Sequence, residues 1–554
     1  MAVKEAIIRL RQEKKSIRDI AGTLGISKST VLYIIKKRER TGELSNGKRT
    51  GRPRKTTLID DQKMLSILEK NPMCTVKQIQ SSLQGAGIAM SQSTIKRRLY
   101  QQKQRGFTHM LAVDEDALGG PPAVTQFLAW CDHVGVKLNP KVAITSDGSV
   151  AQYGLIARDH LMDGEVLFSV PRSALLSQDT SRIQDLLDRE RDRLESPSGW
   201  VPLLLALLYE ATDGTSPWAP YFGLWPGLDP PDLPMFWSEE ERMRLLRGTG
   251  VAEAVNKDLQ NMEREYNTIV LPFIQRHPKT FSAEKHTLDL YKRLVAFVMA
   301  YSFQEPVDEE EDCGKRDPPP MMVPVADLLN HVTENNARLE FTPDYLRMVA
   351  TRPVQPGQEI FNTYGQMANW QLLHMYGFTE PHPHNASETA DIRMWTLHRA
   401  ALQGASSARE QTQVQERWKF LCRLEMVAED GVLVFGREEV MTDDELRTCL
   451  KVLCMSEEKF AEYKENEGWE EDDEEEEPPL MLEDLSDLPA RWRKLLHTST
   501  ALTLATYTDG LETEQAALTD TAAYVALSAR ERHAMQVRYG QKLILQRILD
   551  VAKD

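Results

Sequence analysis

The chain has 554 residues and a formal net charge of −16, with 41% apolar and 27% charged residues. A chain of this length is too long for one hydrophobic core and predicts about three or four domains. The composition excludes a disordered or fibrous protein. No run approaches the roughly 18–20 apolar residues that cross a bilayer, and the amino terminus lacks the apolar segment of a signal peptide. We therefore expect no membrane span and no secretion.

The cysteines give no sign of a cross-linked or metal-bound framework. There are six, widely scattered, and none belongs to a Cys-x-x-Cys pair. Neither a disulfide scaffold nor a zinc cluster is therefore indicated. This usage favours a reducing compartment, the cytosol or the nucleus.

The net charge is divided unevenly along the chain. Residues 1–106 hold 24 Lys and Arg against 8 Asp and Glu, whereas residues 107–554 hold 43 against 75. A basic head thus precedes a strongly acidic body. Such asymmetry predicts two parts with different electrostatic tasks.

The basic head begins with three predicted helices within residues 3–40. Ser16 and Ser27 can cap the second and third of these helices, and Gly25 allows the tight turn between them. This pattern is typical of a helix-turn-helix. The third helix is rich in basic side chains, which suits contact with phosphates and the major groove.

A second three-helix pattern is predicted at 59–101, after a Gly-Arg-Pro-Arg segment at 51–54. An extended Arg-Pro-Arg segment suits a narrow minor groove. The tandem arrangement of residues 1–106 resembles the bipartite DNA-binding region of mariner-type transposases, which implies DNA contact through this head. The body looks nothing like the catalytic half of such enzymes, so we do not expect transposition. The head is a targeting module, a fused transposon remnant, or a set of basic helices without a partner.

The acidic body changes from helix to short strands and back. Apolar residues recur at helical spacing in 122–136, whereas Gly154–Arg158, Glu165–Val170 and Leu346–Ala350 are β-rich runs bounded by Gly, Asp and Pro. Between the second and third strands, about 175–300 is predicted to be mostly helical. The body is therefore an α+β structure with a long helical insertion.

Two local clusters in this body carry candidate chemistry. Ala151, Gln152 and Tyr153 stand directly before a glycine that opens a strand, where backbone groups can approach a ligand closely. Taken alone, this is an ordinary β-turn. Asn330 and His331 follow an apolar segment, so they can face a cleft at the end of a buried element. Taken alone, they form a polar turn with a satisfied histidine.

The third cluster is Glu359–Gly365, an apolar strand that ends in Tyr364. In this order and spacing, the three clusters resemble the SET-domain lysine methyltransferases: a cofactor turn with glycine, then NHxxxxNA, then a strand ending in NTYG. The helical insertion and the helical tail after 376–378 make the chain similar to the Rubisco large-subunit methyltransferase branch. The resemblance spans about 122–554.

The resemblance implies a multidomain α+β fold. An all-α tandem helix-turn-helix would occupy residues 1–106, and a β-rich SET domain residues 122–380, with its helical insertion at about 175–300. An all-α substrate-binding domain would occupy residues 391–554. No zinc is expected, because the cysteine cluster that follows many SET domains is missing from the sequence.

The implied activity is transfer of a methyl group from S-adenosylmethionine to a lysine of a protein substrate. We expect monomethylation of nuclear signalling or chromatin proteins, and hence a location in the nucleus. The acidic runs at 308–312 and 470–477 are either solvated loops or surfaces that attract Lys-rich substrates. The alternative function is a DNA-binding protein whose SET body is a catalytically inactive scaffold.

The resemblance also implies roles for individual residues. Tyr364 is the candidate catalytic phenol, which would hold the methyl group and the amine in line. The expected cofactor-binding residues are Ala151, Gln152, Tyr153, Tyr301, Asn330, His331 and Tyr364. Trp200 and Gln304 are expected to hold the substrate or its lysine. No metal-binding residue is expected.

Overall fold

The computed structural model describes residues 122–146, 149–225, 229–306, 318–423, 427–428, 431–466 and 479–553. The predicted helix-turn-helix pair in 1–106 and the acidic runs at 308–312 and 470–477 lie outside these ranges. Among the helices of the described ranges, none has the length and apolar character that a membrane crossing requires.

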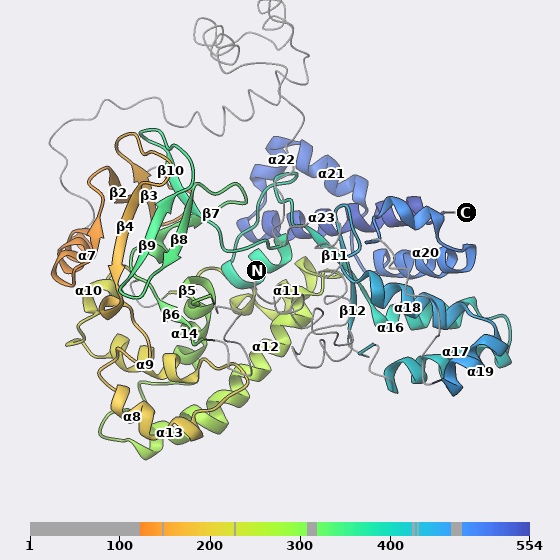
Figure 1. Ribbon diagram of the computed structural model, residues 1–554, viewed down its shortest axis with the longest axis horizontal. Helices are drawn as coiled ribbons and strands as arrows, with labels where there is room; N and C mark the ends of the chain where they lie inside the picture. The colour runs from red at the N-terminus through yellow and green to blue at the C-terminus, as the bar shows by residue number, and fades with distance from the viewer. Residues whose placement is uncertain are drawn as a thin grey trace, which may run out of the picture.

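Two four-stranded sheets form the β-rich part (Figure 1). The first has the order β1, β4, β9, β8, with bounds Lys137–Leu138, Val166–Pro171, Tyr345–Ala350 and Ala337–Phe341. The second has the order β2, β3, β10, β7, with bounds Val142–Thr145, Gly154–Ala157, Glu359–Asn362 and Asn330–His331. All neighbours are antiparallel except β10 and β7, which are parallel. The three β-rich runs predicted from the sequence are β3, β4 and β9, and the predicted strand before Tyr364 is β10.

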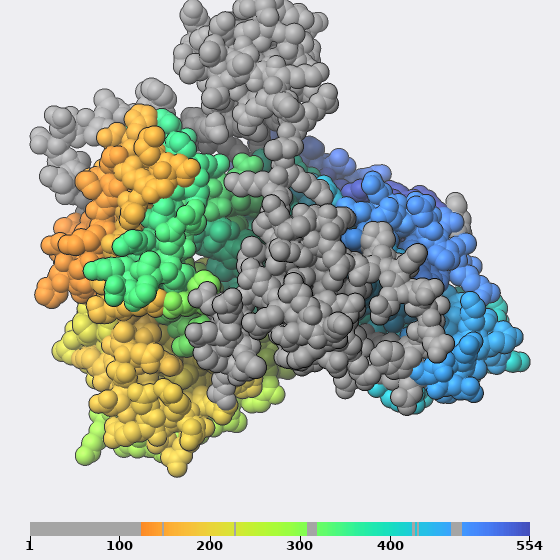
Figure 2. Space-filling model, in the orientation of Figure 1, coloured from red at the N-terminus to blue at the C-terminus, as the bar shows by residue number. Residues whose placement is uncertain are grey.

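The helical insertion packs against these sheets (Figure 2, yellow beside orange and green). After α7 (Pro122–His133), its helices are α8 Gln184–Arg189, α9 Val201–Thr212, α10 Ala219–Phe222, α11 Glu239–Leu245, α12 Val251–Glu265, α13 Leu271–Arg276 and α14 Leu288–Tyr301. A π-helical turn at Tyr266–Val270 joins α12 to α13. Two short strands, β5 Ser302–Phe303 and β6 Met321–Met322, pair after α14.

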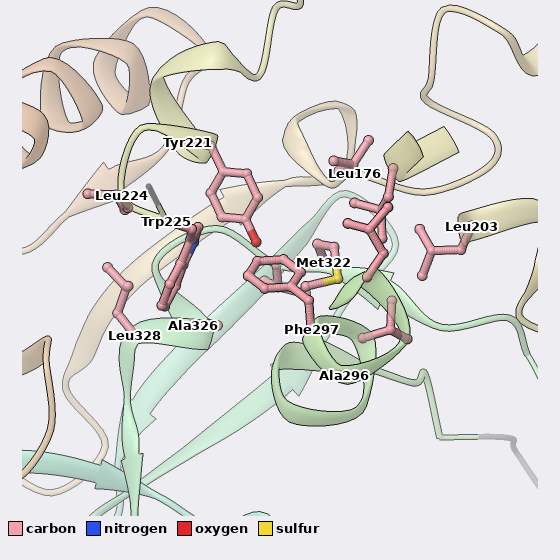
Figure 3. Packing of buried hydrophobic residues seen from close by; sticks show 14 of the residues in the cluster. Leu176, Leu203, Tyr221, Leu224, Trp225, Ala296, Phe297, Met322, Ala326 and Leu328 are labelled. Atoms are coloured by element: carbon pink, nitrogen blue, oxygen red, sulfur yellow. The ribbon is translucent and has the colours of Figure 1, made fainter. Parts of the chain in front are cut away.

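Helix α9 is the most buried helix of the insertion, and almost all of its side chains are apolar. Leu203, Leu204, Leu205, Leu207 and Leu208 are all buried in the same core as the sheets. A helix that is apolar all round must be covered on every side. Figure 3 shows the adjoining part of this core, where Tyr221, Trp225 and Phe297 pack beside Met322.

The C-terminal domain is helical and has its own core. Helix α15 (Asn369–Tyr376) precedes it, and the domain contains α16 Met394–Gly404, α17 Ala408–Arg423, α18 Asp443–Cys454, α19 Glu457–Glu465, α20 Ala490–Leu504, α21 Leu511–Thr519, α22 Thr521–Ala526 and α23 Ala529–Val551. Helix α23 belongs to both cores, since Ala534 and Val537 pack in the first and Ile544 and Leu545 in the second. It therefore ties the two domains together.

The prediction of an all-α C-terminal domain was wrong in one respect. Strands β11 (Thr389–Arg393) and β12 (Val432–Gly436) pair antiparallel over five residues. Side chains of β11 alternate between buried and half-buried, with Ala390 and Ile392 inside. This alternation is the signature of a strand with one face on a core. The sequence reading missed it because helical spacing resumes directly after residue 393.

A buried cluster of charges joins the C-terminal domain to the insertion. Glu514 of α21 lies between Arg538 and Lys542 of α23, at 2.6 Å from Arg538 Nε and 2.5 Å from Lys542 Nζ. All three side chains are at most 7% exposed. Arg538 also donates to the carbonyl of Leu245 in α11, and Gln541 donates to that of Thr249. The cluster therefore reaches across the domain boundary.

Replacing Glu514 with Ala should destabilise the protein strongly. Two cations would remain buried without their carboxylate, and breaking a buried ion pair from one side typically costs about 3–5 kcal/mol. Urea denaturation followed by circular dichroism measures the loss. Glu512→Ala, on an exposed position of the same helix, is the matched control and should change the free energy of unfolding by about 0.5 kcal/mol or less. Equal losses in both variants would contradict the assignment.

Candidate active site

The candidate site forms where strand β10 runs beside the short strand β7. Their parallel register places Phe361 opposite Asn330 and Asn362 opposite His331. The chain then leaves β10 toward Tyr364, whose backbone N–H donates to His331 Nδ1 at 3.0 Å. The structure thus brings the Asn-His pair and Tyr364 together from segments about thirty residues apart.

Tyr364 is held by one hydrogen bond and by stacked rings. Its hydroxyl donates to the carbonyl of Leu329 at 2.9 Å. Its ring lies 5.2 Å from that of His331 and 4.5 Å from that of Tyr376. Burial is the main cause that raises the pKa of Tyr364, and the nearby Tyr301 phenol raises it further. The phenol is therefore protonated at neutral pH and acts as a hydrogen-bonding group, not as a ready base.

Tyr376 and Phe378 are site residues that the sequence reading did not assign. Tyr376 ends α15, and Gly377 then adopts a left-handed conformation with φ 78°. A side chain strains that conformation, so glycine suits the reversal. The turn brings the Phe378 ring to 6.2 Å from Tyr364. The available signal was the Tyr-Gly-Phe triplet, in which two aromatic residues flank a helix-ending glycine.

His331 is a buried, neutral imidazole. Burial lowers the pKa of His331, while the charge of Glu380 partly opposes this shift. Because Nδ1 accepts the Tyr364 amide proton, the ring proton of the neutral form lies on Nε2. His331 therefore fixes the backbone of Tyr364 as well as stacking on its ring.

The turn before β3 lies beside Asn330. The Asn330 side-chain amide donates to the carbonyl of Tyr153 at 2.9 Å. Ala151 and Gln152 are exposed, whereas Tyr153 is half-buried and meets the Trp225 ring edge-on at 6.1 Å. The two predicted clusters thus adjoin each other, although they are about 180 residues apart in the sequence.

Tyr301 belongs to the same aromatic group. Its ring lies 4.5 Å from Trp225 and 5.0 Å from Phe297, at the end of α14. Burial and the charge of Asp327 raise the pKa of Tyr301. Trp225 therefore links Tyr301 to Tyr153. Like Tyr376 and Phe378, it is an aromatic residue that was not predicted to belong to the site.

A buried carboxyl group lies beneath these aromatic rings. Asp327 is in the short helix η6 (Ala326–Leu328), and Tyr221 donates to it at 2.7 Å. Burial raises the pKa of Asp327 to about 7. The charge of Asp327 also raises the pKa values of Tyr301 and Tyr364. Asp327 therefore helps to keep both of these phenols protonated.

Trp200 and Gln304 are placed apart from the other predicted residues. Both line a cavity of about 840 Å³, whose lining does not include Asn330, His331 or Tyr364. The acidic lining residues are Asp179, Asp188, Asp192 and Glu195. One basic residue, Arg191, lines it too and pairs with Asp188 at 2.9 Å. The cavity is therefore acidic on balance.

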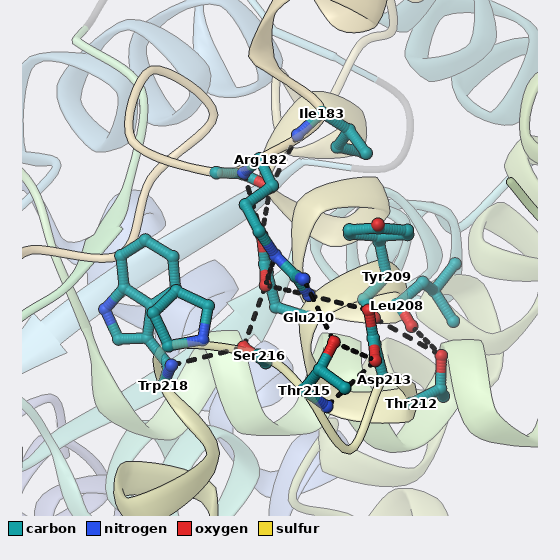
Figure 4. Close-up of polar contacts among 12 residues, drawn as sticks. Arg182, Ile183, Leu208, Tyr209, Glu210, Thr212, Asp213, Thr215, Ser216 and Trp218 are labelled. Atoms are coloured by element: carbon teal, nitrogen blue, oxygen red, sulfur yellow. Dashed lines mark hydrogen bonds and ion pairs between the residues drawn. The ribbon is translucent and has the colours of Figure 1, made fainter.

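Two ion-pair networks involve residues that neighbour the lining residues in the sequence. Glu210, fully buried at the end of α9, accepts hydrogen bonds from Ser181, Arg182 and Ser216 at 2.8–3.1 Å (Figure 4). Beside Gln304, Glu305 forms a bidentate pair with Arg172 at 2.6 and 2.7 Å. A bidentate pair fixes both position and orientation. The Arg172–Glu305 pair therefore holds the backbone directly after Gln304.

The aromatic and amide groups of the site suit S-adenosylmethionine. Aromatic faces such as those of Trp225, Tyr301 and Tyr364 attract a cation and can stack on a flat heterocycle. The neutral amide of Asn330 and the neutral His331 add polar contacts without a competing positive charge. Within the described residues, no group of three or more metal-ligating side chains exists.

Family models match both parts of the chain. One described as "SET domain" matches residues 152–365, and one described as "Rubisco LSMT substrate-binding" matches residues 408–545. The solved "Structure of Rubisco LSMT bound to AdoMet" aligns with a TM-score of 0.54 at 18% identity, covering 78% of this chain and 91% of that one. At this identity the likeness establishes the fold.

Relatives of known name are much more similar in sequence. The "N-lysine methyltransferase setd6" of Xenopus laevis is 63% identical over 433 residues, covering 78% of this chain and 95% of that protein. The human "N-lysine methyltransferase SETD6" is 53% identical over 452 residues, covering 77% and 95%. The fold and the site thus define a SET-domain protein-lysine methyltransferase. More narrowly, the chain belongs to the N-lysine methyltransferase SETD6 family, which favours an enzyme over an inactive scaffold.

Proposed function

We propose that this S-adenosylmethionine-dependent protein-lysine methyltransferase adds a single methyl group to nuclear signalling or chromatin proteins, with Tyr364 as its catalytic phenol. The observation that carries the proposal is the position of Tyr364 at the end of β10. Its hydroxyl is fixed by the Leu329 carbonyl, and Tyr376 and His331 enclose its ring.

The residues around this phenol would hold the cofactor. Asn330, His331 and Tyr301 would contact it together with the backbone of the turn Ala151–Tyr153, which includes Gln152. When bound, S-adenosylmethionine supplies an electrophilic methyl group on a sulfonium. The aromatic faces favour that positive charge.

The reaction requires a neutral lysine amine, since an ammonium has no lone pair. Free lysine has a pKa near ~10.4, and removal from water together with the nearby positive charge of the sulfonium would lower it by disfavouring the lysine cation. The protonated Tyr364 can accept a hydrogen bond from the amine while it donates to Leu329. It would thereby orient the lone pair for attack, and solvent would take the released proton.

The acidic cavity would receive the substrate segment that carries the lysine. Trp200 offers a half-buried aromatic surface and Gln304 an exposed amide. The four carboxylates of the lining attract basic residues near the target lysine. The Arg172–Glu305 pair beside Gln304 reduces the ordering that binding there would require.

Replacing Tyr364 with Phe should lower methyl transfer about 100-fold or more while leaving the fold intact. The ring stack with Tyr376 remains, but the oxygen that orients the amine is lost. Transfer of labelled methyl groups to a lysine-bearing protein substrate measures the effect. Tyr345→Phe, on an exposed tyrosine of β9, is the matched control. Full activity in the Tyr364 variant would rule out the assigned role.

Trp200→Ala should raise KM for the protein substrate by about tenfold and change cofactor affinity little. Loss of a partly buried aromatic contact typically costs about 1–2 kcal/mol of binding. Steady-state kinetics with varied substrate protein, and calorimetry with S-adenosylmethionine, separate the two effects. If cofactor affinity fell while KM stayed the same, the substrate role would be wrong.

The basic head supports DNA contact in the nucleus. Its excess of 16 positive charges, 24 against 8, would release counterions from DNA, so affinity should fall steeply with salt. We expect roughly 1,000-fold weaker binding at 200 mM than at 50 mM salt, and loss of DNA affinity after deletion of residues 1–106. Fluorescence anisotropy with duplex DNA measures both. Methyl transfer in solution should survive the deletion, and unchanged DNA affinity would contradict the proposal.

A further inference from the structure

We propose that Glu359 is a positioning residue for cofactor binding: its carboxylate locks the turn Ser149–Gly154 to Asn330. This inference deepens the proposed function and rests on it, because the turn and Asn330 are the cofactor-binding residues proposed above. Glu359 itself lies in β10, five residues before Tyr364. None of the roles assigned above includes it.

Three donors converge on the carboxylate. Oε1 accepts from the Ser149 hydroxyl at 3.0 Å and from Asn330 Nδ2 at 2.7 Å. Oε2 accepts from the backbone N–H of Val150 at 3.0 Å. Ser149 in turn accepts from the N–H of Ala151 at 3.3 Å. Two neighbouring amides of the turn are therefore directed inward, and the turn is bound to Asn330 through one side chain.

The local sequence is adapted to this close approach. A Cβ atom on Gly154 would lie 2.5 Å from Glu359 Oε1 and 2.4 Å from Ser149 Oγ, so any side chain there would displace the carboxylate. Strand pairing sets Glu359 opposite Ile156 of β3. Asn336 fixes the same strand from its other side, since its amide donates to the Glu359 carbonyl at 2.9 Å.

Glu359 is buried, so its carboxylate needs hydrogen-bond donors from the protein in place of water. Glu359 is 8% exposed, and no ion pair to it exists among the described residues. Burial raises the pKa of Glu359, whereas the bonds from Asn330, Ser149 and Val150 lower it. A buried acid without a cation is costly unless its acceptor capacity is used. Here both oxygens are used, and both serve the same turn.

Glutamine cannot reproduce this arrangement. It has the size of glutamate but offers one acceptor oxygen and an NH₂ group. In either orientation the NH₂ group of the glutamine would face another donor, namely the Val150 N–H or the donors of Ser149 and Asn330. Glu359→Gln should therefore release the turn without opening a cavity. The effect should appear in cofactor affinity more than in the chemical step.

The test uses the full chain and two readouts. Calorimetry with S-adenosylmethionine should give a Kd about tenfold higher or more for Glu359→Gln, with kcat at saturating cofactor within about threefold of the wild type. Hydrogen exchange should quicken at the amides of Val150 and Ala151. Glu340→Gln changes an acid of β8 whose side chain is 39% exposed and pairs with Arg338. It removes the same charge and should change neither readout.

The outcomes separate this inference from the proposed function. A wild-type chain that does not bind S-adenosylmethionine would overturn the proposed function itself. A wild type that binds, with the same Kd and the same amide exchange in Glu359→Gln, would overturn the positioning role alone. If Glu359→Gln fails to fold, Ser149→Ala removes one donor and one acceptor of the lock. It should then raise Kd in the same direction, and an unchanged Kd would again refute the role.

Discussion

The parallel pairing of β10 with β7 is the constraint on which the site depends. All other neighbouring strands of the two four-stranded sheets are antiparallel. A parallel pair sends both strands toward the same edge, so the residues that end them meet there. Asn330 and His331 thus lie beside the exit of β10, and Tyr364 follows directly. The direction of the two strands therefore places the Tyr364 phenol next to Asn330 and His331, independently of side-chain contacts.

The packing below this corner determines its chemistry. Apolar helices of the insertion cover the sheets and carry Tyr221 and Tyr301 toward it. The resulting low dielectric keeps the phenols protonated and His331 neutral. The carboxyl groups near this corner, Asp327 and Glu359, are buried and hydrogen-bonded to Tyr221 and Asn330. The acidic lining residues lie in the separate cavity around Trp200 and Gln304.

Much of this arrangement could be predicted from the sequence. The strands at 154–158, 165–170 and 346–350 follow from short apolar runs between turn residues, and the helical insertion follows from its apolar spacing. That the turn Ala151–Tyr153 lies beside Asn330 could be predicted only from the family resemblance. No local sequence pattern specifies a contact between segments about 180 residues apart. Glu359 was read only as part of a strand, since a lone acid in a strand gives no sign of its partners. Strand β12 was hidden by the helices on both sides of it.

The buried Glu514 cluster has a consequence for how the enzyme meets its substrates. Arg538 and Gln541 of this region donate to the carbonyls of Leu245 and Thr249 across the domain boundary, and α23 packs in both cores. Separating the two domains would break these hydrogen bonds and expose apolar surface to water. Hinge opening between them is therefore disfavoured. A substrate protein encounters a surface whose shape exists before contact, so discrimination among substrates depends on fit and charge more than on adaptation.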